Sequence, residues 1–178
     1  KKGDKAVLIL NKTSFYAESG GQVGDQGFLS NQSFKFIVND TTKIFGKYFL
    51  HWGEVVEGTC NIGENLEISI DSNRRNLIKN NHTSTHLLHY SLRNILGKHV
   101  TQKGSLVNNE KLRFDFNHSN QIDSNEISKI EILVNKFIKK KFIVKTEILD
   151  HKEAIKIGAI ALFGEKYGDE VRVVSIGS

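Results

Sequence analysis

The chain has 178 residues, of which 38% are hydrophobic, and this size allows one ordinary domain or two small ones with a hydrophobic core. One cysteine, Cys60, excludes a disulfide framework and fits a reducing cytoplasm. No apolar run approaches the length of a membrane span or has the pattern of a signal peptide, so we expect a cytoplasmic protein without a membrane partner. The net charge of +5 and the pI near 9.2 allow contact with an anionic partner.

Residues 1–71 carry the pattern of short strands separated by glycine and asparagine turns. Residues 5–10 are apolar, and polar and apolar residues alternate in 34–38, 44–52 and 66–71. This arrangement predicts a small β-barrel in the N-terminal part of the chain.

Residues 72–178 mix helix and strand patterns. Asp71 or Ser72 is expected to cap a helix that runs to about Leu96, where Gly97 supplies a stop. Further elements are a strand at 112–116, a helix at 122–140, a strand at 143–149, a short helix capped by Asp150 and a strand at 171–176. The predicted fold class is therefore α+β, with a β-barrel subdomain at 1–71 and an α+β core at 72–178.

A glycine-rich segment at 13–27 interrupts the strand pattern. Gly20, Gly21 and Gly24 permit positive φ and close backbone approach, so the segment can press against a ligand or another part of the backbone. No Gly-Lys-Ser/Thr follows it, which excludes a Walker loop. The alternative is a tight hairpin between strands. Its polar candidates for ligand contact are Glu18, Gln22 and Asp25.

Two histidines, His82 and His86, lie four residues apart in the predicted long helix. Side chains at this spacing share a helix face and can point at one metal ion. No glutamate follows the first histidine, so the pattern is not that of an H-E-x-x-H protease. A zinc site needs three or four protein ligands, and the sequence shows no second cluster at ligand spacing. The alternative is that both are polar residues of a partly exposed helix.

Positive charge is concentrated at Arg74, Arg75, Lys79 and residues 136–141. The lysine run is typical of a solvated helix end, where cations suit the helix dipole. For Arg74 and Arg75, phosphate contact is the favoured interpretation. No RNA-recognition-motif signature is present, so we expect binding to the backbone and terminus of a nucleic acid.

Several segments together resemble the editing domain of the alanyl-tRNA synthetase family. The segments are the glycine-rich residues 13–27, the histidine helix 82–89, residues 102–105, residues 112–116, and residues 158–159 with 161–169. They span nearly the whole chain in the family's order. The resemblance implies a long metal-binding helix packed on an antiparallel sheet, and it relates the chain to AlaX-type trans-editing proteins and to the threonyl-tRNA synthetase editing-like domain.

The resemblance also implies a zinc ion held by His82, His86 and two further ligands. In the family, a Cys-Gly-Gly-Thr-His segment that follows the strand resembled by 171–176 supplies those two. This chain stops at Ser178, and Cys60 does not match the family's cysteine. We therefore interpret the chain, which also starts without methionine, as a piece that holds half of a zinc site. A site of two histidines alone is weak and open to water.

The implied reaction is hydrolysis of Ser-tRNA(Ala) and Gly-tRNA(Ala). An alanine-activating site rejects serine and glycine only about 10–200-fold by binding, so a second, hydrolytic site is needed. The family places Thr85 and Gln102 around the aminoacyl group. The alternatives are a bond from Thr85 to its own helix and an exposed strand position for Gln102.

The family's remaining contacts concern the acceptor end of tRNA(Ala). The expected substrate contacts are Glu18, Gly20, Gly21, Gln22 and Arg113, and Arg74 and Arg75 are expected tRNA contacts. A local salt bridge between Arg113 and Asp115 is an equal alternative, since alternate strand residues face one side. ATP and magnesium are expected only in the absent aminoacylation domain, and neither DNA binding nor oligomerisation is indicated.

Two other classes of protein compete with a cis-editing domain. One is a free-standing AlaX-type deacylase, and the missing initiator methionine and the end before the cysteine segment favour an excised piece over it. The other is a non-catalytic tRNA-binding module. The presence of His82, Thr85, His86 and Gln102 favours a working site over such a module.

Overall fold

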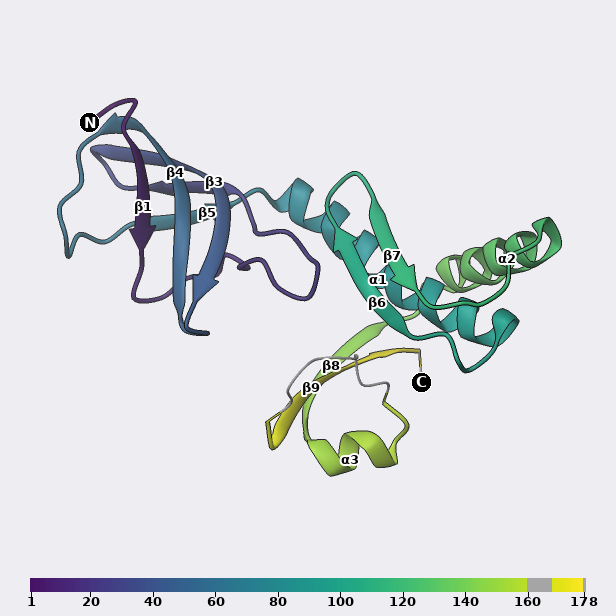
Figure 1. Ribbon diagram of the computed structural model, residues 1–178. Helices are drawn as coiled ribbons and strands as arrows, with labels where there is room; N and C mark the ends of the chain where they lie inside the picture. Colours follow the sequence, from purple (N-terminus) through teal and green to yellow (C-terminus); the bar gives the residue numbers. More distant parts are fainter. Residues whose placement is uncertain (160–167, 178) are drawn as a thin grey trace. The chain divides into compact units, whose positions relative to one another are not determined.

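The computed structural model describes residues 1–159 and 168–177. The chain divides into two compact units (Figure 1), the first formed by residues 1–85 and 104–113, and the second by residues 86–103 and 114 onwards. This division by packing does not test the predicted ranges 1–71 and 72–178. The segment at 161–167 that resembles a family motif lies outside the described residues. Within the described ranges no helix is long and apolar enough to cross a membrane.

The first unit is built on an antiparallel five-stranded sheet in the order β1-β4-β3-β2-β5. Its strands are β1 (Lys5–Ile9), β2 (Gly27–Ser30), β3 (Phe34–Ile44), β4 (Tyr48–Gly58) and β5 (Glu67–Ile70). Among the described residues β1 and β5 are the edges, so the sheet is open and not the closed barrel that we predicted. Both edge strands have only four or five residues, which leaves few backbone groups for a closing ladder.

One apolar core supports this sheet. Register shifts in the β3–β4 ladder at Lys35/Phe36 and Val38/Asp40 mark β-bulges, which increase the local twist of a sheet. Alternate residues of β3 are buried, as period-2 alternation predicts. The core consists of Phe15, Leu29, Phe34, Phe36, Val38 and Val55.

The strand predicted at residues 44–52 is wrong in its bounds. The chain turns at Phe45 and Gly46, which both have positive φ, and β3 and β4 pair on either side as a hairpin. The alternation of apolar residues continues through the turn, so periodicity alone did not reveal it. The short strands β2 and β6 (Gln102–Val107) were also not predicted as elements.

The long helix α1 (Ser72–Leu96) has the predicted bounds. Asp71 caps its first turn, because the Asp71 carboxylate accepts the Arg74 N–H at 2.9 Å, and Gly97 follows its last residue with a φ of 119°. The strands β6 and β7 (Leu112–Phe116) form a two-stranded sheet of their own. The predicted helix and strand of this region, 72–96 and 112–116, are confirmed.

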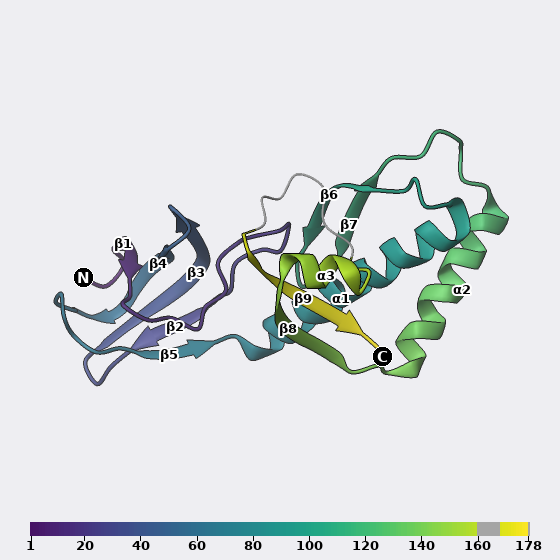
Figure 2. The same cartoon turned by 90° about the horizontal axis from the view of Figure 1, so that it is seen from below.

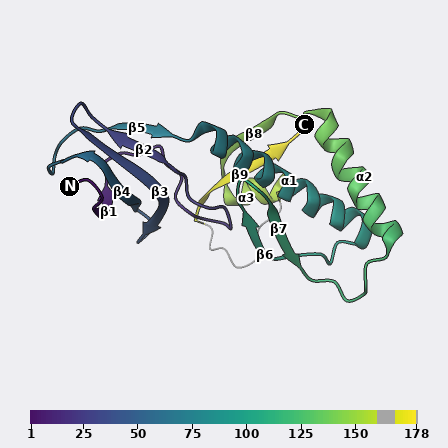
Figure 3. The ribbon, with the colours of Figure 1, turned by 90° about the horizontal axis from the view of Figure 1, so that it is seen from above.

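The second unit holds α2 (Ser124–Lys140), β8 (Val144–Asp150), α3 (His151–Lys156) and β9 (Glu170–Ile176). Asp123 and Glu126 form a capping box at the start of α2. Figure 3 shows α2 lying beside the C-terminal half of α1, where Leu92, Val100 and Ile130 are buried together.

The strands β8 and β9 form a separate antiparallel pair with α3 against it (Figure 2). Ala154 of α3 packs with Val171 and Val173 of β9. Asp150 caps α3 as predicted, because its carboxylate accepts the Lys152 N–H at 2.8 Å.

Candidate functional site

The glycine-rich segment makes a tight turn that docks on β6. Ser19 and Gln22 exchange backbone hydrogen bonds of 3.1 and 3.0 Å around Gly20 and Gly21, whose φ values are 57° and 80°. Gly21 needs glycine for a second reason, since a Cβ there would lie 2.5 Å from the backbone oxygen of Ser105. The Val107 N–H donates to the Gly21 oxygen at 2.8 Å, so the turn is fixed to β6 by the backbone itself.

The segment is anchored from the other side by a buried carboxylate. Asp25 is 1% exposed and accepts hydrogen bonds from the Tyr16 N–H and from Nε and Nη2 of Arg75. Arg75 Nη2 also donates to the Ser14 oxygen at 2.8 Å, and Arg74 Nη1 donates to the Gly24 oxygen at 2.8 Å. The first turn of α1 therefore holds both ends of the segment through two arginines.

One side chain of the turn reaches the predicted metal-binding helix. Gln22 is 8% exposed, and its Oε1 lies 2.6 Å from Nδ1 of His82 on α1. A carboxamide oxygen can only accept, so the imidazole donates from Nδ1. In the neutral ring the lone pair is then on Nε2, which is the form of histidine that binds a metal. Both residues are candidates from their sequence motifs, but no sequence pattern pairs them.

The structure also describes the remaining residues that we predicted to contact the substrate or the metal. Thr85 is buried, and its hydroxyl donates to the Asn81 oxygen at 2.9 Å, which is the local bond expected as its alternative role. Glu18 and Arg113 are exposed. His86 follows one helical turn after His82 on α1, and Gln102 is the first residue of β6; both belong to the second unit.

The described residues contain no group of three or more His, Cys, Asp or Glu side chains that could hold a metal ion. A zinc site needs three or four protein ligands, so His82 and His86 alone would not complete one. The residue types are compatible with metal ligation, because imidazoles four residues apart share a helix face and the bond from His82 Nδ1 to Gln22 leaves the Nε2 lone pair of a neutral ring for a metal.

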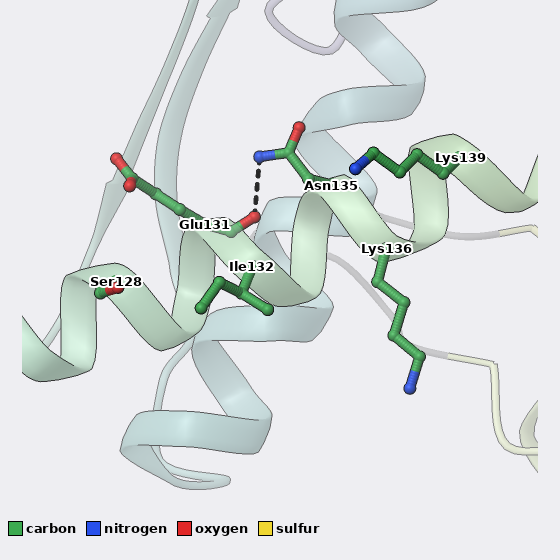
Figure 4. Close-up of a pocket in the computed structure, with 6 residues that line it drawn as sticks. All are labelled: Ser128, Glu131, Ile132, Asn135, Lys136 and Lys139. Carbon is green, nitrogen blue, oxygen red and sulfur yellow. Dashed lines mark hydrogen bonds between the residues drawn. The ribbon is translucent and has the colours of Figure 1, made fainter.

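A depression of about 610 Å³ lies on α2 (Figure 4). Its lining comes from successive turns of this one helix, and Asn135 Nδ2 donates to the Glu131 oxygen at 2.9 Å within it. It contains no histidine or cysteine, and two lysines of the predicted lysine run border it. The lining residues are Ser128, Glu131, Ile132, Asn135, Lys136 and Lys139. We interpret it as the solvated face of a helix end.

The residues of this chain against which the glycine-rich segment packs were not predicted from the sequence. Ser105 and Val107 receive the turn, but their segment carries no strong strand alternation. Asp25 was named as a ligand candidate, yet its carboxylate serves the fold by binding Arg75. A buried acid 50 residues away from its arginine has no local sequence signal.

Comparison with known proteins gives a consistent answer. The family profile of the class II (A) tRNA synthetases matches residues 1–74. The chain is 51% identical over 175 residues to an alanine–tRNA ligase of Haemophilus influenzae, and this alignment covers 98% of the chain and 20% of the ligase. It is 48% identical over 177 residues to the enzyme of Rhodopseudomonas palustris and 50% identical over 178 residues to that of Polynucleobacter asymbioticus, with coverage of 99% and 100% of the chain and 20% of each ligase. The chain thus spans about one fifth of the length of these relatives, and it belongs to the alanyl-tRNA synthetase family.

Proposed function

We propose that this chain supplies the editing site of an alanyl-tRNA synthetase, which hydrolyses Ser-tRNA(Ala) and Gly-tRNA(Ala). The observation that carries the proposal is the hydrogen bond between Gln22 and His82, which joins the glycine-rich turn to the histidine helix. Two motifs 60 residues apart in sequence thereby become one polar site. Ligation of alanine to tRNA(Ala) with ATP and magnesium is proposed for the whole protein, in the cytoplasm.

Zinc is the proposed metal, with His82 and His86 as two of its ligands. When bound, it would polarise the ester carbonyl or lower the pKa of a water molecule. The contribution of this chain is to place two imidazoles one helical turn apart and to hold His82 with its proton on Nδ1. A ligand fixed by a second hydrogen bond is more basic and better oriented than a mobile one.

Thr85 is proposed to contact the aminoacyl group as an acceptor. Its hydroxyl proton is committed to the Asn81 oxygen, so the Thr85 oxygen can receive a hydrogen bond from a serine hydroxyl or from the amino group of the substrate. Alanine offers no side-chain hydroxyl, and an unpaired polar group in such a site costs about 1–3 kcal/mol. Gln102 is proposed as a second polar contact, which gives the site its preference for serine over alanine.

The tRNA is proposed to approach with its acceptor end. Glu18, Gly20, Gly21 and Arg113 remain the proposed substrate contacts, and Arg74 and Arg75 the proposed tRNA contacts. In the structure both arginines also hold the glycine-rich segment. The Arg75 charge is compensated by Asp25, so we expect its phosphate contact to be weaker than that of a solvated arginine.

Deacylation of charged tRNA tests this function. Ser-tRNA(Ala), Gly-tRNA(Ala) and Ala-tRNA(Ala) would be incubated with this chain and with a version extended through the family's Cys-Gly-Gly-Thr-His segment, and zinc would be measured in both. We expect the extended protein to bind zinc stoichiometrically, hydrolyse the first two substrates and spare the third. His82→Ala and His86→Ala should abolish both properties, whereas His118→Ala should retain them, because His118 bonds to His99 and lies outside the histidine pair.

Two outcomes would overturn the proposal. Hydrolysis that survives His82→Ala and His86→Ala would exclude the histidine pair. If neither protein hydrolyses Ser-tRNA(Ala) while both bind tRNA, the chain is a non-catalytic tRNA-binding module.

A nuclear magnetic resonance measurement separates the tautomer from the reaction. Long-range ¹⁵N–¹H correlation at pH 8 should show the His82 proton on Nδ1. In Gln22→Leu, which keeps the volume but cannot accept, the proton should redistribute to Nε2. Gln22→Glu keeps an acceptor and should keep the Nδ1 proton. A wild-type ring protonated on Nε2 would contradict the assigned role of Gln22.

A further inference from the structure

The hairpin of β3 and β4 extends beyond the rest of the sheet in the first unit. The outer edge of β3 pairs with β2 only over residues 35–38, and the outer edge of β4 pairs with β1 only over residues 50–54. Residues 43–49 of the hairpin therefore pair only with each other among the described residues. We call residues 41–52 the ribbon. Figure 1 shows its end, where β3 and β4 run past β1.

The tip of the ribbon carries an aromatic residue that the fold does not explain. Phe45 and Gly46 are the central residues of the turn, and both have positive φ, at 51° and 70°. Asn-Gly is the usual pair for such a turn, and a bulky residue in the left-handed region is an outlier. Burial does not compensate for this geometry, because Phe45 is 88% exposed. A strained backbone with an exposed ring suggests a function for the ring.

Further aromatic residues lie behind the tip on one face of the ribbon. Ile44 is directly opposite Tyr48, and Trp52 follows four residues later in β4, so the three side chains share a face. Each is more than 40% exposed. The Trp52 indole donates to Thr42 Oγ1 at 2.8 Å, which fixes the orientation of the ring. The face thus offers ordered rings to a partner.

The positive charge of the ribbon indicates which class of partner it binds. Lys43 and Lys47 are exposed, and Lys47 Nζ lies 4.9 Å from the centre of the Tyr48 ring. No acidic residue occurs between Thr41 and Gly53. Exposed rings alternating with lysines match a single-stranded nucleic acid, whose bases stack on rings while its phosphates contact cations. A protein partner would need no such positive charge.

We propose that the ribbon binds unpaired nucleotides of RNA, with Phe45 as the stacking residue and Lys43 and Lys47 as phosphate contacts. The identity of this RNA as tRNA rests on the proposed function. The proposed stacking and phosphate contacts at residues 43–47 include neither Gln22 nor His82, so they add a binding surface and take no part in hydrolysis. It also amends our expectation that nucleic acid is bound without stacking rings.

Fluorescence anisotropy with labelled tRNA, whose 3′ end is single-stranded, tests the ribbon. Loss of one base-stacking ring weakens binding by about 5-fold to 150-fold. We expect this loss for Phe45→Ala and also for Phe45→Leu, which keeps an apolar side chain without a ring. Phe45→Trp should bind as tightly as the wild type. Ile62→Ala, at a fully exposed loop position, is the matched control and should change nothing.

The lysines are tested through the salt dependence. Lys43→Ala and Lys47→Ala should each reduce the slope of log K against log salt by about 0.7, the value for one phosphate of a single strand. Lys152→Ala, an exposed lysine on α3, is the control. A blunt RNA duplex, which has no unpaired nucleotides, should bind the Phe45 variants and the wild type equally.

The outcomes separate this inference from the proposed function. If the wild-type chain binds no tRNA, the tRNA partner fails and the ribbon proposal falls with it. If the wild type binds and Phe45→Ala binds equally well, only the ribbon proposal fails. If Phe45→Leu behaves as wild type while Phe45→Ala changes the sedimentation of the protein, the surface docks protein and not RNA.

Discussion

The two compact units solve the problem of buried polar groups differently. In the first unit, Asp25, Thr41 and His51 are at most 1% exposed, and each has hydrogen-bond partners. In the described part of the second unit, His89 Nε2 and Ser91 Oγ are buried without a hydrogen-bond partner. Its apolar core is also split into two small clusters, whereas the first unit has one.

This difference shows which unit depends on buried hydrogen bonds to fix its conformation. The polar network of the first unit fixes an irregular loop, which apolar packing alone would leave mobile because it has no preferred direction. The second unit consists mainly of regular elements, whose backbone is satisfied internally. We therefore expect substitutions of buried polar residues to lower the free energy of unfolding more in the first unit than in the second.

Asp25→Ala should give the largest effect. The substitution leaves the Arg75 guanidinium and the Tyr16 N–H without their buried acceptor, and breaking a buried pair in this way costs about 3–5 kcal/mol. Urea unfolding followed by circular dichroism would measure the loss. Hydrogen exchange should place it in the glycine-rich segment and in the first turns of α1.

Asp4→Ala is the matched control, since Asp4 forms an exposed ion pair with the N-terminus. Such pairs contribute about 0–1 kcal/mol. If the two substitutions cost the same, the buried network does not stabilise the first unit in the way we describe.

Gly21→Ala should follow in size, with Gly20→Ala as its internal comparison. Both residues have positive φ, so alanine costs about 1–2 kcal/mol at either position. At Gly21 the new Cβ also collides with the backbone of Ser105, whereas at Gly20 nothing lies within 4 Å. Thermal unfolding of the two variants measures the difference, and equal melting temperatures would show that the turn does not depend on its contact with β6.

These substitutions also show what the sequence could predict. The bounds of α1 follow from Asp71 and Gly97, which mark the ends of a helix through local chemistry. The turn at Phe45 was missed because phenylalanine is not a turn residue and the alternation of apolar residues does not stop there. Patterns of neighbouring residues thus predict a helix end with the usual capping residues, but not a turn built from an unusual residue.

The candidate site likewise contains residues that local sequence patterns reveal and residues that they do not. His82 is recognisable because its spacing from His86 is a helical repeat. Its partner Gln22 lies 60 residues upstream in a loop, and no periodicity connects the two. Long-range polar contacts depend on the packing of the first unit, so they had to come from the structure.

A pair of histidine substitutions compares the polar groups of the two units directly. His51 donates from Nδ1 to the Leu8 oxygen, and its Nε2 accepts from the Thr13 hydroxyl. His51→Leu leaves both groups unpaired and should cost about 1–3 kcal/mol. His89→Leu should cost about 1 kcal/mol or less, because it loses the bond of His89 to the Val100 backbone but also removes the unpaired Nε2, and the Val100 oxygen keeps its bond from Arg93.

Urea unfolding of both variants checks this comparison. A cost for His89→Leu as large as that for His51→Leu would mean that His89 Nε2 is satisfied by a group such as an ordered water molecule. Phe116→Leu serves as a control for general loosening of the core around His89.

The smallest expected effect is a loss of stability at acid pH, to which both histidines contribute. Burial lowers the pKa of His51 below its ordinary value of 6.5, against a smaller opposite effect of its bond to Leu8. Burial also lowers the pKa of His89, opposed by a bond to the Val100 backbone and reinforced by the charge of Arg93. Between the lowered folded pKa and 6.5, the unfolded chain binds more protons than the folded chain.

Stability is therefore complete above pH 6.5 and declines as the pH falls from there through the folded pKa of each histidine. At pH 8 the effect vanishes, because the rings are neutral in both states. Denaturant unfolding at pH 8, 6 and 5 should show a smaller decline in His89→Leu than in the wild type. The decline should also be smaller in His51→Leu, although this variant starts from a lower stability at pH 8. If both variants keep the wild-type decline, the acid sensitivity does not come from these two histidines, and the two units do not differ in how they bury histidine.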